Sequence, residues 1–94
     1  MIVTRVDRTR TSFVRSFQAL PDEIARLAAK AIAALLQDPL PKRLRFHKLE
    51  GYRNPKIYTI DITQNHSHKI SLELIGTVAV LRKAATHKEI DRAP

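Results

Sequence analysis

The chain has 94 residues and a formal net charge of +8, which predicts a single domain over residues 1–94 with a polyanionic or acidic partner. Cysteine is absent, which excludes disulfides, thiolate metal sites and a cysteine nucleophile and fits a reducing cytoplasm. No apolar run approaches the ~18 residues that a membrane span needs, and the N-terminus lacks the apolar core of a secretory signal, so we expect a cytoplasmic protein.

The N-terminal half predicts one strand and two helices. Residues 2–6 can form the strand, and the apolar residues Phe13, Phe17 and Leu20 then recur at helical spacing behind capping side chains at positions 9–12. Pro21, followed by two acids, favours the start of a second helix. That helix continues through apolar residues at i, i+3, i+4 and i+7, namely Ile24, Leu27, Ala28, Ala31, Ile32, Leu35 and Leu36. The prolines of Asp38-Pro39-Leu40-Pro41 end it.

Beyond Pro41 the apolar pattern changes to the two-residue period of β-strands. It predicts strands at 44–49, 57–62, 68–75 and 77–84, the last being central in the sheet, with turns at 64–67 and 76–77. The order βααββββ has no crossover helix after residue 40. It therefore predicts an α+β fold, in which a two-helix hairpin packs on a mainly antiparallel sheet of four to five strands.

The first of these strands carries much of the positive charge. Residues 42–56 include six basic residues and one acid. In a strand, Leu44 and Phe46 point into the core while Arg43, Arg45 and His47 share the other face. That face combines cations with a titratable imidazole, as a site for a polyanion requires.

Common catalytic and metal motifs are missing from the sequence. The chain has two glycines, Gly51 and Gly76, so it has no glycine-rich phosphate loop, and it has no His-Glu-x-x-His pair. His66 and His68 have a spacing that could serve a metal, but no third ligand lies near them, so we predict neither a metal nor a cofactor.

Taken together, several segments in order resemble the RelE/ParE toxin superfamily over roughly residues 10–92. The resemblance lies in Leu20-Pro21-x-x-Ile24, the helix end at Asp38-Pro39, Leu44-Arg45-x-His47-Lys48-Leu49-x-Gly51, Ile57-Tyr58-x-Ile60-x-Ile62, His68-Lys69-Ile70 and Thr86-His87-Lys88-Glu89-Ile90. It implies the toxin of a bacterial type II toxin–antitoxin pair, bound by a cognate antitoxin.

The resemblance leaves the molecular target open. RelE-like members cleave mRNA on the ribosome without a metal, which makes an endoribonuclease with mRNA and ribosome as partners the first hypothesis. ParE-like members poison DNA gyrase on the same fold, and an inactive member would only bind its antitoxin and repress its operon.

The histidines resemble those of the YafQ-like mRNA interferases. The resemblance implies a catalytic set of His47, His68 and His87, with His66 as the alternative to His68. Histidine suits proton transfer because its pKa of about 6.5 leaves both forms populated near neutrality. The expected phosphate-binding cations are Arg43, Arg45, Lys48, Lys69 and Arg82.

Two features qualify this site. Strand alternation places Arg45 with His47 and turns Lys48 to the other face, so Arg45 is the better phosphate ligand. The chain also departs from the family pattern, since Ile90, Asp91 and Arg92 stand where several ribonuclease members carry an aromatic residue, and Ala84-Ala85 replaces a glycine before Thr86-His87.

Overall fold

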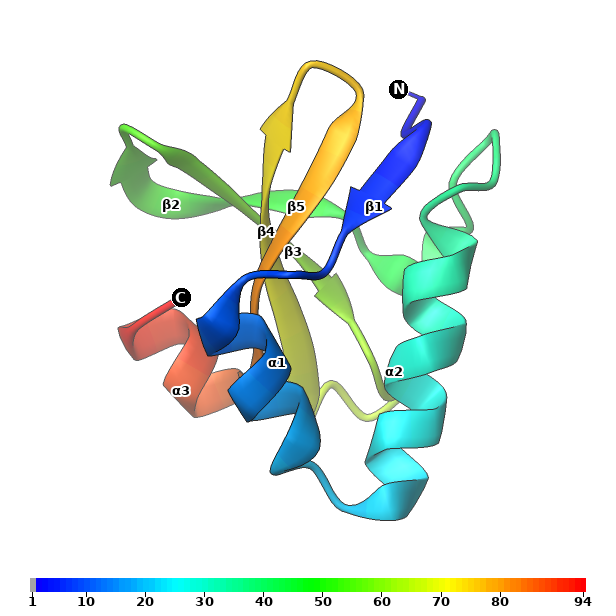
Figure 1. The fold of residues 1–94 in the computed structure, drawn as a ribbon, viewed down its shortest axis with the longest axis vertical. Helices are drawn as coiled ribbons and strands as arrows, with labels where there is room; N and C mark the ends of the chain where they lie inside the picture. The colour runs from blue at the N-terminus through cyan, green and yellow to red at the C-terminus, as the bar shows by residue number, and fades with distance from the viewer. Residues whose placement is uncertain (1) are drawn as a thin grey trace.

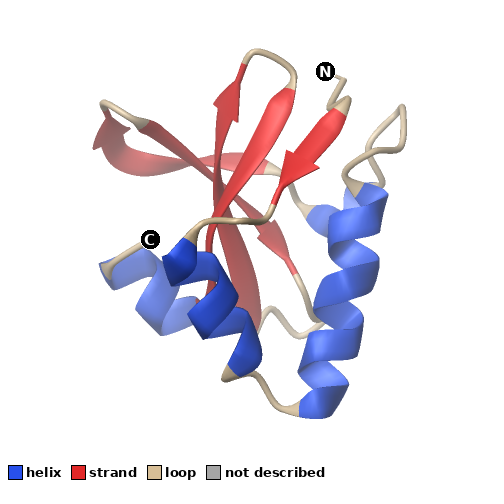
Figure 2. Ribbon diagram, viewed as in Figure 1, coloured by secondary structure: helices blue, strands red, loops and turns tan. Residues whose placement is uncertain are grey.

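The computed structural model describes residues 2–94, and within them it has three α-helices, a short 3-10 helix and a five-stranded sheet (Figures 1 and 2). None of these helices is long and apolar enough to cross a membrane. In chain order the elements are β1 (Arg5–Asp7), α1 (Thr11–Gln18), α2 (Asp22–Ala34), η1 (Lys42–Leu44), β2 (His47–Arg53), β3 (Lys56–Asp61), β4 (His68–Ile75), β5 (Val78–Thr86) and α3 (His87–Arg92).

The sheet has the strand order β1-β5-β4-β3-β2. Strand β1 runs parallel to β5, and the other neighbours are antiparallel. Gly76 turns the chain between β4 and β5 with a φ of +61°, a conformation that glycine adopts without steric cost. The predicted α+β fold with a mainly antiparallel sheet is confirmed, and β5 is central as predicted.

One face of the sheet carries the core beneath the α1–α2 hairpin. Phe13 of α1 and Ile32 of α2 pack in the same buried cluster as Ile60 of β3 and Ile70 of β4. The alternate residues Tyr58, Ile60 and Ile62 of the strand predicted at 57–62 also belong to this cluster. Because apolar area removed from water contributes about 25 cal/mol per Å², this layer holds the helices on the sheet.

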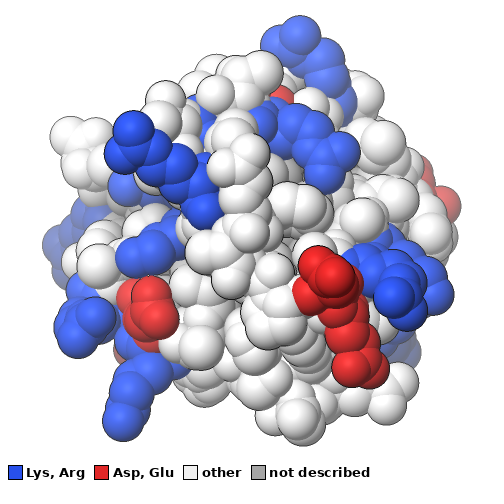
Figure 3. Space-filling view, turned by 60° about the horizontal axis from the view of Figure 1, so that its bottom comes forward, with Lys and Arg blue, Asp and Glu red and all other residues white. Residues whose placement is uncertain are grey.

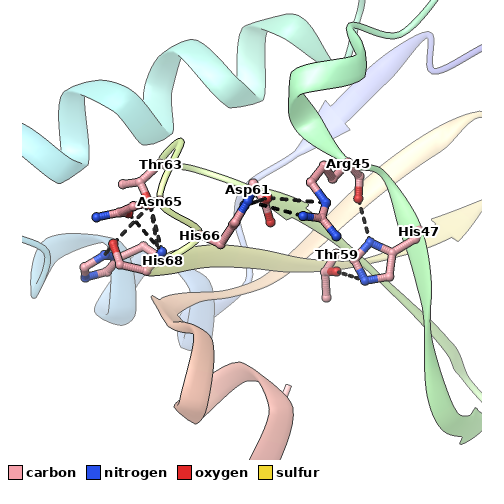
Figure 4. A network of polar contacts seen from close by, with 9 residues as sticks. Arg45, His47, Thr59, Asp61, Thr63, Asn65, His66 and His68 are labelled. Atoms are coloured by element: carbon pink, nitrogen blue, oxygen red, sulfur yellow. Dashed lines mark hydrogen bonds and ion pairs between the residues drawn. The ribbon is translucent and has the colours of Figure 1, made fainter.

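Helix α3 covers part of the opposite face. It packs on β4 and β5, and its Ile90 is buried outside the hairpin core. Ile57 and Ala85 are likewise buried outside that core, as strand alternation requires of neighbours of Tyr58 and Ala84. Figure 4 shows α2 and α3 on opposite sides of strands β3 and β4.

The strand predicted at 44–49 is wrong in its first half. Residues 42–44 form a 3-10 turn, with Leu44 N–H donating to the Pro41 carbonyl at 3.1 Å, and this turn inserts Leu44 into the core at 1% exposure. Arg45 then takes a left-handed conformation, and the strand begins at His47. The chain must bury Leu44 before it joins the sheet, which strand alternation alone does not reveal.

Other boundaries differ less. The strand at 68–75 is exact, the second helix begins at Asp22 as Pro21 indicated, and the first strand lies at 5–7 instead of 2–6. Helix α3 was not predicted, although Thr86 and Glu89 have capping-box spacing, and the Thr86 hydroxyl accepts from the Glu89 N–H at 3.3 Å.

Candidate functional site

The sheet face opposite the hairpin is polar at its centre. The buried polar or charged residues of the described chain all lie on β3 and β4, and they are Thr59, Asp61, Lys69 and Ser71. Register places Thr59 beside Ser71 and Asp61 beside Lys69, and His47 of β2 lies beside Thr59. We call these five residues the polar face. They alternate along their strands with core residues, so they point away from the hairpin.

His47 is oriented by two contacts. Its Nδ1 lies 2.6 Å from the carbonyl oxygen of Arg45, and its Nε2 lies 3.3 Å from the Thr59 hydroxyl (Figure 4). Since a carbonyl only accepts, the neutral ring carries its proton on Nδ1, and Nε2 accepts from Thr59. His47 therefore presents Nε2 over the polar face.

Asp61, His66 and Arg45 form a second set of contacts in the same region. Asp61 Oδ2 accepts from His66 Nδ1 at 2.5 Å, and His66 Nε2 lies 3.2 Å from Arg45 Nη1. Arg45 Nε lies 3.9 Å from Asp61 Oδ2. A carboxylate only accepts and a guanidinium only donates, so both contacts require the same neutral tautomer, with the proton on Nδ1.

Backbone strain is concentrated at this cluster. Arg45 and His66, with φ of 47° and 62°, are the two non-glycine residues of positive φ in residues 2–94. Such a conformation costs on the order of 1–3 kcal/mol per residue and is kept where the surroundings impose it. Both residues contact Asp61, which is 4% exposed. The carboxylate is thus the point around which two strained loops are arranged.

Asp61 is also incompletely satisfied. Its Oδ1 is buried without a hydrogen-bond partner among the residues that the structure describes. Asp61 lines a groove of about 570 Å³ between α2 and the turn after β3, whose polar lining includes Arg43, Thr63 and Asn65. Of the three residues of this cluster, Asp61 lines the groove, whereas Arg45 and His66 do not.

The other predicted histidines lie apart from this cluster. His68 lines a separate cavity of about 230 Å³ with Leu20 and Pro21 of the hairpin, and its Nδ1 is 2.8 Å from the Ser67 hydroxyl. His87 begins α3, and its backbone N–H donates to the Ser67 carbonyl at 2.9 Å while its Nε2 lies 2.7 Å from Asp91. The structure brings His47 and His66 together through Arg45 and separates His68 from them.

The cations predicted to bind phosphate do not all lie on the polar face. Lys69 belongs to the polar face and is 8% exposed, whereas Lys48 lies beside Tyr58 on the hairpin side. Arg43 is exposed and lines the groove beneath α2, so its predicted place on the face of His47 is wrong. The cause is the 3-10 turn, which removes residue 43 from the sheet.

Arg82 is held in an ion-pair cluster. Its guanidinium bonds to Glu73, which also pairs with Arg10 at 2.9 Å, and its Nε donates to the Pro94 carbonyl at 3.4 Å. Burial raises the pKa of Glu73, but the hydrogen bonds and charges of Arg10 and Arg82 outweigh burial and leave the pKa lowered. Arg82 thus has structural partners in place of a phosphate.

Sequence reasoning missed Asp61 and Thr59. Both alternate with the core-facing residues Tyr58, Ile60 and Ile62, so both lie on the face of His47. An acid at a buried strand position beside a basic segment is the signal that would have found Asp61.

Charge on the outer surface is mainly positive, as the composition requires. Figure 3 shows one face of the molecule, on which lysine and arginine side chains lie at several places and the acids form small groups between them. In residues 2–94 no three histidine, aspartate or glutamate side chains are grouped to hold a metal ion.

Known structures share this fold. No protein-family model and no curated protein sequence matches the chain. The crystal structure of the RelB-RelE antitoxin-toxin complex from Methanococcus jannaschii matches with a TM-score of 0.67 and 24% identity, covering 90% of this chain and 96% of that one. The archaeal RelE-RelB complex from Pyrococcus horikoshii OT3 matches with a TM-score of 0.61 and 19% identity over 92% and 96%.

A third match is the solution structure of the conserved hypothetical protein HP0894 from Helicobacter pylori. Its TM-score is 0.63 at 16% identity, over 96% of this chain and 99% of that one. The chain therefore has the RelE fold, and the family resemblance of its sequence is confirmed at the level of the fold.

Proposed function

We propose that this protein is the toxin of a toxin–antitoxin pair and a metal-free endoribonuclease that cleaves mRNA on the ribosome in the cytoplasm. The observation that carries the proposal is the link through Arg45. Its carbonyl holds His47 and its guanidinium contacts His66, so two imidazoles with defined tautomers flank one cation. RNA cleavage through the ribose 2′-hydroxyl needs such a set, namely a base, an acid and a cation.

His66 is the proposed base. Its Nε2 takes the proton of the 2′-hydroxyl, and Asp61 stabilises the imidazolium that forms, as the carboxylate of a catalytic triad does. The 2′-oxygen forms a bond to phosphorus, and the bond from phosphorus to the 5′-oxygen breaks. The products are a 2′,3′-cyclic phosphate and a 5′-hydroxyl.

His47 is the proposed acid. In its protonated form, stabilised by the Arg45 carbonyl at 2.6 Å, it gives the Nε2 proton to the leaving 5′-oxygen. Arg45 and Lys69 stabilise the charge on the phosphorane. His87 stays a predicted participant because its backbone is bonded to Ser67, which follows His66, and His68 stays a weaker one.

An antitoxin is the proposed partner. Two matching structures are complexes of RelE with RelB, and a net charge of +8 favours an acidic binding segment. We expect that segment to be an amphipathic helix or a disordered stretch that folds as it covers the basic surface.

The test is expression of the chain without a partner, followed by measurement of growth, mRNA integrity and DNA breaks. We expect growth arrest with cut mRNA, and purified protein should cut mRNA only when ribosomes are present. His66→Ala and His47→Ala should abolish cutting, whereas Lys48→Ala, an exposed control on the hairpin side, should retain it.

The alternatives give different results in the same experiment. Double-strand DNA breaks with intact mRNA would identify a gyrase poison. Normal growth would identify an inactive, antitoxin-binding protein. Either result would refute the ribonuclease.

A further inference from the structure

We propose that Arg45 blocks the general base until substrate binds, a role that we call a latch. Without substrate its guanidinium donates a hydrogen bond to Nε2 of His66, and the substrate phosphate draws the guanidinium away. The proposal rests on the proposed function, because it assigns the regulation of the same site. It makes one side chain responsible for both phosphate binding and exposure of the base.

The resting contact blocks the atom that the reaction needs. With Nδ1 of His66 donating to Asp61 at 2.5 Å, Nε2 holds the ring's available lone pair. That lone pair faces Arg45 Nη1 at 3.2 Å. A lone pair that accepts from a guanidinium cannot take a proton from a ribose hydroxyl, so the base is inactive in this arrangement.

The latch is held weakly enough to open. The Arg45 side chain is 58% exposed, its acceptor on His66 is a neutral ring nitrogen, and its Nε is 3.9 Å from Asp61, beyond hydrogen-bond distance. A phosphate offers two charged oxygens in the geometry of the guanidinium fork, so it can form a bidentate pair in which both partners are charged, whereas His66 offers one neutral nitrogen. Phosphate therefore competes favourably with His66 for Arg45.

Opening does not disturb the rest of the site. His47 is held by the backbone carbonyl of Arg45, not by its side chain, and Asp61 keeps its bond to His66 when the guanidinium leaves. The left-handed backbone of Arg45 separates these two roles, because the carbonyl serves one histidine while the side chain reaches the other. Phosphate binding thus frees one lone pair within an assembled site.

The first experiment follows the His66 imidazole by 15N NMR in the purified full chain, with inorganic phosphate as the probe. In the wild type, phosphate should shift the Nε2 resonance of His66 as its hydrogen bond to Arg45 is lost. In Arg45→Asn the resonance should start near the phosphate-bound position and stay there. Asn is chosen because it tolerates a φ of 47° better than most residues.

The second experiment measures ethoxycarbonylation of His66 by diethyl pyrocarbonate, read by mass spectrometry. Uncovering Nε2 should make His66 in Arg45→Asn react at least fivefold faster than in the wild type. His47 is the internal reference, because its contact to the residue 45 carbonyl is retained. Lys42→Asn, which changes a neighbouring exposed cation, should leave the rate for His66 unchanged.

Equal reactivity of His66 in the wild type and Arg45→Asn, or an Nε2 resonance that phosphate does not move, would overturn the latch. Neither measurement uses RNA, so a latch that opens in a protein that leaves mRNA intact would refute the proposed ribonuclease alone.

Discussion

The two faces of strands β3 and β4 are built from alternate residues of the same segments, yet they differ in kind. The hairpin face presents Ile60, Ile70 and Leu72, all fully buried in one apolar core. The polar face presents Thr59, Asp61, Lys69 and Ser71, which are nearly as deeply buried. Burial alone therefore does not separate the part of the sheet that holds the fold together from the part that we assign to chemistry.

The two faces do differ in whether every buried polar group has a hydrogen-bond partner. Buried polar groups are normally hydrogen-bonded, because an unpaired one costs about 1–3 kcal/mol. The polar face keeps Asp61 Oδ1 without a partner in the described chain and holds two non-glycine residues at positive φ beside that carboxylate. One face is optimised for stability, whereas the other retains local costs that a bound substrate can offset.

The largest expected effects come from neighbouring residues on opposite faces. Ile60→Ala should destabilise the fold by about 2–5 kcal/mol because it leaves a cavity in the core, and the protein that remains folded should still cleave RNA.

Asp61→Asn should lower RNA cleavage by at least about 100-fold, with a loss of stability on the order of 1 kcal/mol. Urea denaturation and a ribosome cleavage assay measure both. A stable Ile60→Ala or an active Asp61→Asn would contradict the division of the faces.

A smaller effect is expected at Thr59, which contacts His47. Thr59→Val keeps the shape of the side chain but removes the hydroxyl that lies 3.3 Å from Nε2, so cleavage should fall about tenfold with stability nearly unchanged. Ser71→Ala is the matched control, because its hydroxyl bonds to the Pro94 carbonyl at 2.9 Å and not to a histidine. An equal loss of cleavage in the two variants would show that the polar face acts as a whole.

Helix α3 should depend on its cap. Thr86→Ala removes the hydroxyl that accepts from Glu89 N–H, which should cost about 1 kcal/mol of stability, and Thr86→Ser should restore it. Thermal unfolding measures the difference. If Thr86→Ala matches the wild type, the packing of Ile90 alone holds α3 on the sheet.

The smallest effect is expected at Glu73, and it depends on pH. The folded-state pKa of Glu73 is lowered, so its ion pairs stabilise the fold above the unfolded pKa of about 4.5, and this stability is lost as pH falls through the folded value. Glu73→Gln should therefore be less stable than the wild type at pH 7, by at most about 1 kcal/mol, and equal to it in strong acid. Denaturation curves across this pH range would refute the prediction if the difference did not change.

The sequence predicts most of this fold because its periodicities are strong. The run Ile24 to Leu36 has a clear helical period and residues 70–74 alternate, so the strand lies where predicted and the helix begins where predicted. The helix ends early, at Ala34, and leaves Leu36 exposed. The segment 42–46 could not be placed, because burial of Leu44 through a 3-10 turn is a tertiary demand. Helix α3 is short enough that its period does not emerge from six residues.

The site was predictable only in part. His47 and Arg45 lie together as expected, but the left-handed backbone of Arg45 brings them together and not strand alternation. The choice between His66 and His68 depends on the turn after β3. His66 reaches Asp61 from a left-handed backbone, and a non-glycine residue in that conformation leaves no mark in the sequence. The sequence did not predict Asp61 as a site residue because its apolar neighbours in β3 indicate a core strand.

The pairing of β1 with β5 has a consequence for how the chain folds. Thr4 and Thr77 bond through their hydroxyls at 2.6 Å although 73 positions separate them. Contacts of such long sequence separation form late, because the loop must be closed before they contribute. Until β1 docks, β5 is an open edge that another chain can pair with. Changes near residues 4–7 should therefore promote aggregation during refolding, even though these residues lie outside the proposed catalytic cluster.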